Sequence, residues 1–158
     1  MSKPHDRLRE LGLTLPAPPP PAASYIPTRL VPVGESRALL FIAGQVSSRE
    51  GARLTGRCLD QVSIAQAQDA ARAAALNVLA QIEAAAGLDN VIEVAQLIGW
   101  VLSTDDFGDQ PKVMNAASEL IADVLGDAGK HTRAAVGASA LPFSVTVEIT
   151  AVVVVRKD

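Results

Sequence analysis

The chain has 158 residues, 49% hydrophobic and 20% charged, with a formal net charge of −3 at pH 7. This length and apolar content predict one folded domain with a sizeable core and exclude general disorder. The slight excess of acid and an aromatic content of only 3% argue against a nucleic-acid partner, because phosphate contacts need clustered cations and base stacking needs aromatic rings.

Cysteine and histidine are scarce. One cysteine, Cys58, and two histidines are too few for an internal disulfide or a zinc site, and we expect no cofactor. No N-terminal apolar run resembles a signal peptide, and none reaches the roughly 18 residues that span a bilayer. The composition therefore predicts a cytoplasmic protein without a membrane segment.

The N-terminal segment differs from the rest of the chain. Residues 5–12 predict a short helix that ends at Gly12. The following stretch, TLPAPPPPAAS at 14–24, is rich in proline, so it is either a polyproline ligand for an aromatic groove or a stiff connector on the domain surface. We assign 1–24 to an N-terminal helix and arm, and 25–158 to the folded domain.

Three strands and two helices follow. Residues 25–33 predict an edge strand, because two prolines interrupt the run, whereas LLFIAGQV at 39–46 predicts a central buried strand. Gly44 lies near its end, where a missing side chain permits close approach by a ligand or another backbone. An alanine-rich helix at 63–86, a strand at 91–103 and a helix at 110–125 come next.

The last quarter of the chain predicts two more strands, at 133–139 and 144–155. In the second, the odd-numbered residues are all apolar, while the even-numbered face is polar at Glu148 and apolar at Val152 and Val154. Pairing of these two strands with each other would bring Arg133 and Glu148 close together.

The resulting order, β-β-α-β-α-β-β, predicts an α+β sandwich with a mixed sheet and two helices on one face. Two helices cover only that face, and a monomer of this size rarely leaves the other one exposed when it is apolar. We therefore expect the second sheet face to be buried against other copies of the chain.

Two charged residues are candidates for chemistry. Arg133 presents a planar fork that suits a carboxylate, so it is either a substrate clamp or a partner in an interface ion pair. Glu148 is either a base that orients water or a carboxylate paired with a cation such as Arg133.

Four other residues were weighed for a role. Tyr25 is typical of an edge-strand packing residue, and Asn115 is typical of a local hydrogen-bonding residue on a helix. Cys58 and His131 have no recognisable partners for nucleophilic chemistry. The residues alone thus predict an oligomeric α+β domain with a pocket at an interface.

Four stretches of the chain resemble the Rid/YjgF family, whose members are reactive intermediate deaminases, also described as endoribonuclease L-PSP or chorismate mutase-like domains. These stretches are LLFIAGQV at 39–46, ALNVLAQIEAA at 75–85, PKVMNAASEL at 111–120 and TRAAVGASALPFSVTVEITA at 132–151. The resemblance covers nearly the whole chain from Tyr25, and the N-terminal LGLTLPAP is similar to a longer YjgF-like subfamily.

The resemblance implies a chorismate mutase-like fold, a homotrimer with clefts between subunits, and no metal. It implies that Arg133 grips a substrate carboxylate, that Glu148 positions water, and that Tyr25, Asn115 and Gly44 line the substrate site. The implied reaction hydrolyses 2-iminoacids or enamines to 2-ketoacids and ammonia; a small carboxylate-bearing metabolite is the implied partner, with no nucleic acid and no membrane.

This chain departs from the deaminase branch beside its arginine. Ala134 and Ala135 follow Arg133, where that branch has a small polar residue or cysteine, and His131-Thr132 replaces the usual proline-alanine. The departures leave two alternatives to a deaminase: a trimer that binds a carboxylate metabolite without turnover, and, less favoured, an endoribonuclease.

Overall fold

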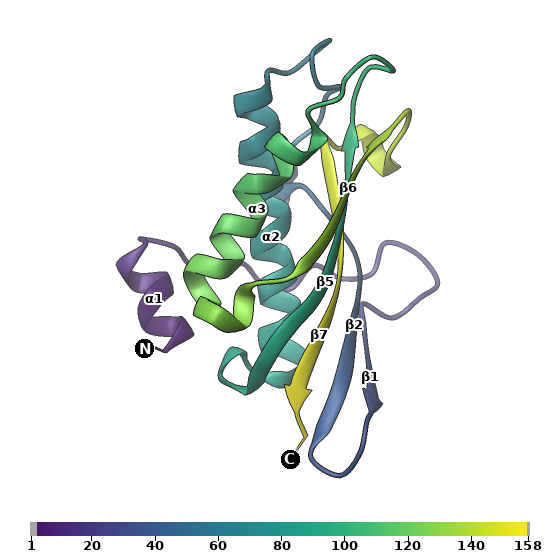
Figure 1. Cartoon of the computed structure of the whole chain (residues 1–158). Helices are drawn as coiled ribbons and strands as arrows, with labels where there is room; N and C mark the ends of the chain where they lie inside the picture. The colour runs from purple at the N-terminus through teal and green to yellow at the C-terminus, as the bar shows by residue number, and fades with distance from the viewer. Residues whose placement is uncertain (1–2, 158) are drawn as a thin grey trace.

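The computed structural model describes residues 3–157. Two long helices pack side by side on one face of a five-stranded sheet, and a short N-terminal helix lies outside them (Figure 1). The strand order is β1-β2-β7-β5-β6, with a separate two-stranded hairpin β3-β4. The helices and strands are α1 Pro4–Glu10, β1 Thr28–Pro32, β2 Arg37–Val46, β3 Ser48–Arg49, β4 Ala52–Arg53, α2 Ile64–Ala86, β5 Val91–Leu102, α3 Gln110–Leu125, β6 Thr132–Ala138 and β7 Val147–Arg156.

The expected α+β sandwich with a mixed sheet is confirmed. All neighbouring strands are antiparallel except β5 and β6, which run parallel. The predicted helix at 63–86 forms as α2 and begins with the expected capping box, in which the backbone N–H of Gln66 donates to Ser63 Oγ and Gln66 Oε1 accepts from the N–H of Ser63. It ends at Gly87, whose φ of 79° few other residues adopt without strain.

The expectation that the two C-terminal strands pair with each other is wrong. β6 pairs with β5 in parallel, and β7 lies on the other side of β5. The reason is that β5, α3 and β6 form one β-α-β unit, in which the crossover helix returns the chain parallel to the first strand. β6 is thus an edge strand, and residues 139–146 carry the chain past the end of β5 to reach β7.

The two faces of β7 are packed differently. The odd-numbered residues from Val147 to Val155 are all buried beneath the helices. The even-numbered residues from Glu148 to Val154 are half-buried and belong to the face that carries no helix. On this open face, Phe41 lies opposite Val152 and is 43% exposed. The predicted helix-free apolar face is therefore present in the single chain.

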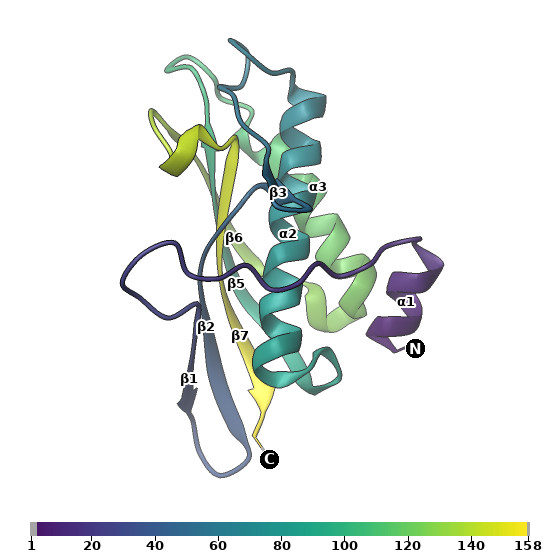
Figure 2. The same cartoon turned by 180° about the vertical axis from the view of Figure 1, so that it is seen from behind.

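The N-terminal segment lies against the domain. Leu8 is buried, and Arg7 Nε donates to the backbone oxygen of Asp123 on α3 at 3.0 Å. After α1 the chain crosses over α2 before it turns back to β1 (Figure 2), and Gln81 Nε2 donates to the carbonyl of Pro19 at 2.7 Å. These contacts fit the stiff connector laid on the surface. None of the helices in the described part of the chain is long and apolar enough to cross a membrane.

Candidate functional site

Arg133 lies on the edge strand β6, and its side chain reaches toward α3. In the register of the sheet it stands opposite Leu97, a buried residue of the helix-covered face. Its Nη1 donates to Asn115 Oδ1 at 3.1 Å and to Ser118 Oγ at 3.0 Å, and its Nη2 donates to the carbonyl of Pro111 at 3.3 Å. Two successive turns of α3 therefore fix the guanidinium from one side.

All three acceptors of Arg133 are neutral groups. The ion pairs found among residues 3–157 involve other side chains. A guanidinium has five N–H donors and remains protonated at any working pH. Arg133 uses three of these donors, so its charge and two N–H groups remain for an anion. Among residues 3–157, Arg133 thus forms no ion pair.

His131 extends this arrangement by one more bond. Its Nδ1 contacts the carbonyl of Gly129 at 2.6 Å, and its Nε2 contacts Ser118 Oγ at 2.9 Å. A carbonyl only accepts, so Nδ1 carries a proton, and in the neutral ring Nε2 accepts from the Ser118 hydroxyl. Burial, reinforced by the charge of Arg133 and opposed by the bond to Gly129, lowers the pKa of His131, which favours the neutral ring.

Glu148 stands on β7 among different neighbours. Its register partners are Val46 and Trp100, and none of the hydrogen bonds among the described residues reaches its carboxylate. Burial raises the pKa of Glu148 above its ordinary value. The carboxylate is therefore a better proton acceptor than one in water.

Gly44 makes room for Glu148. β2 carries an irregularity between Ile42 and Gln45, and a Cβ built at Gly44 would overlap the carboxylate of Glu148. The predicted close approach at Gly44 therefore occurs, and within the chain it is made by the Glu148 side chain. Any larger residue at position 44 would displace that carboxylate.

Arg133 and Glu148 do not share a pocket within one chain. Arg133 belongs to the helix-covered face and contacts α3, whereas Glu148 belongs to the open face. The expected proximity is wrong because β5 separates β6 from β7 and because the two residues point to opposite sides of the sheet. Two hollows of about 420 and 450 Å³ lie near α2 and the β3-β4 hairpin, and neither includes Arg133 or Glu148.

Of the other predicted residues, Asn115 lies at Arg133 and Tyr25 lies in the arm before β1. Asn115 is exposed on α3 and binds Arg133, as described above. Tyr25 is 45% exposed in the arm before β1, where its hydroxyl accepts from the N–H of Ala22. It does not pack within an edge strand as we expected, because β1 begins only at Thr28, after Pro27.

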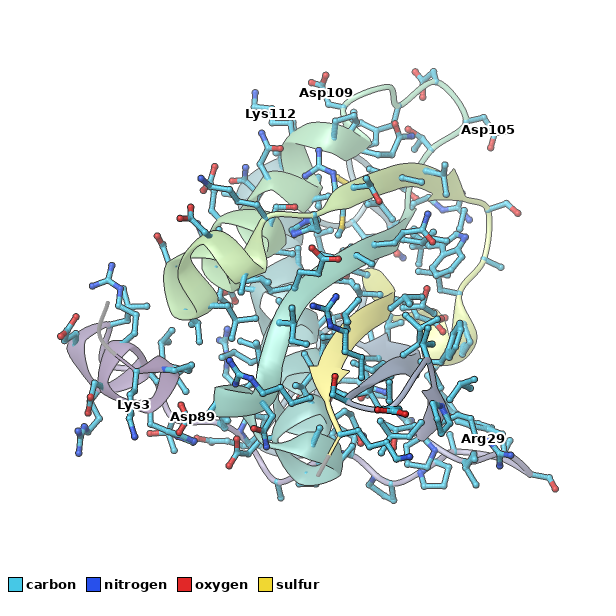
Figure 3. The ribbon with its side chains drawn as sticks, turned by 60° about the horizontal axis from the view of Figure 1, so that its bottom comes forward. Lys3, Arg29, Asp89, Asp105, Asp109 and Lys112 are labelled. Carbon is cyan, nitrogen blue, oxygen red and sulfur yellow. The ribbon has the colours of Figure 1, made fainter. Side chains whose placement is uncertain are left out.

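The two alanines after Arg133 lie on different faces of β6. Ala134 is exposed on the open face, and Ala135 packs against the core. Figure 3 shows that Asp105, Asp109 and Lys112 project outward around the start of α3, while Arg29 projects from the opposite edge of the sheet. In residues 3–157, no group of three or more acidic, histidine or cysteine side chains is arranged to hold a metal ion.

Sequence reasoning missed His131 and Ser118. Their spacing holds the signal, because His131 and Arg133 are two residues apart, as same-face neighbours of an extended chain are, and Asn115 and Ser118 are three apart on one helix. The missing information was that β6 lies against α3. Only the parallel pairing of β6 with β5 brings these two pairs together.

Comparisons with known proteins agree with this fold. A sequence model of the family described as endoribonuclease L-PSP matches residues 18–155. Protein TCP17 of Trypanosoma cruzi is 39% identical over 149 residues, which is 92% of this chain and 90% of that protein.

Two crystal structures are similar over most of the chain. Atu1372 of Agrobacterium tumefaciens, a protein of unknown function, is 42% identical with a TM-score of 0.84 and covers 96% of this chain and 92% of its own. A candidate endoribonuclease of Shewanella oneidensis is 25% identical with a TM-score of 0.89 and covers 96% and 99%. The chain belongs to the endoribonuclease L-PSP family, also called the YjgF/Rid family.

Proposed function

We propose that this protein is a 2-iminoacid and enamine deaminase that acts in clefts between the subunits of a homotrimer. The observation that carries the proposal is the Arg133 guanidinium, which α3 fixes through neutral acceptors only. An arginine held in this way binds a planar carboxylate with two parallel hydrogen bonds. A free 2-iminoacid presents such a carboxylate beside its reactive carbon.

The need for a second subunit follows from the two faces of the sheet. Arg133 and Asn115 lie on one side of the chain, and Glu148 lies over Gly44 on the other. A site that uses both halves must take them from two copies. The helix-free apolar face around Phe41 gives the copies a surface to pack against.

In the proposed reaction, Arg133 holds the carboxylate and the imine carbon is the electrophile. Water forms a bond to this carbon while Glu148 accepts a proton from the water. Glu148 then returns the proton to the nitrogen, which gives a neutral carbinolamine. The proton of its hydroxyl group moves to the same nitrogen as the C=O bond forms and the C–N bond breaks, so ammonia leaves with a 2-ketoacid as the other product. No electrons are transferred, so no oxidant, reductant or metal is part of the proposal.

The raised pKa of Glu148 suits this role. A carboxylate that must accept and then donate a proton works best when its pKa lies close to the working pH. Burial moves Glu148 in that direction. An enamine such as 2-aminoacrylate would enter the same reaction after it tautomerises to the imine.

The deciding experiment measures 2-ketoacid and ammonia release from 2-iminoacids generated in situ, with wild type and Arg133→Ala compared side by side. We expect acceleration by wild type and a loss of at least about 100-fold in kcat/KM in the variant, because a charge-assisted bidentate contact is removed. A well-folded oligomer that binds 2-ketoacids without any acceleration would instead be the non-catalytic carboxylate-binding protein.

The family name also raises endoribonuclease activity. The net charge of −3 and the scarcity of aromatic residues do not favour an RNA-binding surface. Incubation of labelled RNA with wild type and Arg133→Ala, under controls free of contaminating nuclease, tests this. Cleavage by wild type alone would contradict the proposal that the arginine serves a small carboxylate.

A further inference from the structure

A chain of hydrogen bonds leads from the candidate anion site into the protein. Arg133 Nη1 donates to Ser118 Oγ at 3.0 Å, and Ser118 Oγ contacts His131 Nε2 at 2.9 Å. His131 is anchored at its other nitrogen by the carbonyl of Gly129 at 2.6 Å. The side chains of Arg133, Ser118 and His131 are each half-buried, so protons from solvent can reach them, whereas Gly129 is buried.

A proton added to His131 must go to Nε2, because Nδ1 already carries one. The Ser118 hydroxyl then turns and accepts from Nε2–H, and its second lone pair still accepts from Arg133. The site therefore keeps its geometry while it gains a second positive charge one hydroxyl away from the guanidinium.

Few other charges act on His131. Arg133 is the charge that opposes its protonation, in addition to burial. Asp127 and Lys130, from the segment before β6, pair with each other at 2.7 Å. On α3, Glu119 and Asp123 are exposed. Among these charged side chains, Arg133 is therefore the one whose neutralisation would favour a proton on His131.

We propose that His131 is a positioning residue of the Arg133 site and that it takes up a proton when a carboxylate binds there. A bound carboxylate cancels the repulsion from Arg133, so the protonated ring becomes easier to form. By linkage, protonated His131 strengthens carboxylate binding by the same factor. This inference rests on the proposed function, since it assumes that Arg133 binds a carboxylate.

The probe is pyruvate, a simple 2-ketoacid, and the readout is NMR titration of the histidine ring protons of the full chain. The chain has two histidines, and the spectrum of His131→Gln assigns the signal of His131. His5, which lies 3.3 Å from Glu83 and has a 51% exposed side chain, serves as the internal control. We expect saturating pyruvate to raise the titration midpoint of His131 and to leave that of His5 unchanged.

Calorimetry measures the affinity of wild type and of the variants for pyruvate at two pH values. Wild type is expected to bind pyruvate about fivefold more tightly at pH 5 than at pH 8, the low end of typical coupling between sites. Binding by His131→Gln should vary less with pH, and His5→Gln should behave like wild type. Ser118→Ala should weaken binding at both pH values, with recovery in Ser118→Thr, because only threonine keeps a hydroxyl at position 118 that accepts from Arg133.

The possible failures are distinguishable. Pyruvate binding that requires Arg133 but leaves the His131 titration unchanged would overturn this inference and keep the proposed function. Absence of both pyruvate binding and imine hydrolysis would overturn the two together. Where imines are hydrolysed but pyruvate binds too weakly to saturate, the same pH comparison of KM between wild type and His131→Gln decides the matter.

Discussion

The two faces of β7 both carry valines toward the C-terminal end of the strand, but their surroundings differ. On one face, Ile149, Val153 and their odd-numbered neighbours are buried beneath α2. On the other, Val152 and Val154 are only half-buried, and no helix covers them. The wholly apolar face is the one that the helices cover, whereas the valines of the other face stay half-buried because the chain provides no second layer there.

The two candidate residues, Arg133 and Glu148, also lie on these two different faces of the sheet. Arg133 is fixed by contacts within its own chain, through α3. Glu148 has a space made for it by Gly44 but no hydrogen-bonding partner in the part of the chain described. On the helix-covered face, α3 holds the guanidinium of Arg133 in place. On the open face, the carboxylate of Glu148 remains available to the surface that packs against it.

Truncation of a side chain on the helix-covered face of β7 is expected to have the largest effect on stability. Ile149→Ala removes a fully buried side chain, which costs about 2–5 kcal/mol of unfolding free energy. Thr150→Ala, the neighbouring open-face residue, should cost less than about 1 kcal/mol. Urea unfolding at equal protein concentration measures both, and equal losses would mean that the two faces are packed alike.

A charge on the open face should disrupt assembly while the fold is retained. Phe41→Asp places a carboxylate in the middle of the helix-free face, opposite Val152. We expect the concentration for half-dissociation to rise roughly 30-fold or more, the factor for a 2 kcal/mol hot spot. Light scattering and circular dichroism measure mass and fold.

Leu59→Asp is the matched control, since Leu59 is an exposed apolar residue outside the five-stranded sheet. Its mass should equal that of wild type. A wild-type mass equal to one 16.4 kDa chain would contradict the proposed assembly directly.

Much of the fold could be predicted from local patterns. The capping box at Ser63 and the glycine stops located both long helices, and alternation located β7 with the correct inward face. The pairing of β6 could not be read in this way, because strand order depends on which distant segments meet. A β-α-β unit was present in the predicted order, and its preference for parallel pairing was the overlooked signal.

The site was predicted less completely than the fold. Arg133, Glu148 and Gly44 were singled out from residue type and position, and family resemblance added Asn115 and the substrate roles. The structure brings together Arg133 with Asn115 and Glu148 with Gly44. His131 was set aside because its partner, Ser118, lies 13 positions earlier on another element. Contacts of this kind follow from packing between elements, which no spacing along one element reveals.

Filling the space beneath Glu148 should impair activity without unfolding the chain. In Gly44→Ala the new methyl group would occupy the position of the carboxylate, so the side chain must turn away. We expect kcat/KM for imine hydrolysis to fall about 10- to 100-fold, since a misplaced proton acceptor loses most of its effect. Gly108→Ala is the matched control, because a Cβ there meets no atom within 4 Å.

The smallest expected effect is a pH-dependent gain in stability from Glu148→Gln. Burial raises the pKa of Glu148, so between the ordinary and the raised value the folded chain holds more protons than the unfolded chain. Stability therefore falls as the pH rises through this window, and the cost is absent at low pH, where both states are protonated. Since the side chain is only partly buried, we expect Glu148→Gln to be more stable than wild type by at most about 0.5 kcal/mol at pH 8.

Urea unfolding of wild type and Glu148→Gln at pH 4 and pH 8 measures this difference, with the exposed Glu119→Gln as control. The two proteins should be equally stable at pH 4. A loss of stability in Glu148→Gln at pH 8 would mean that a cation reaches the carboxylate in the assembled protein. Glu148 would then be fixed by an ion pair across the interface, and the open face would resemble the face of Arg133, with a charge held in place before any substrate arrives.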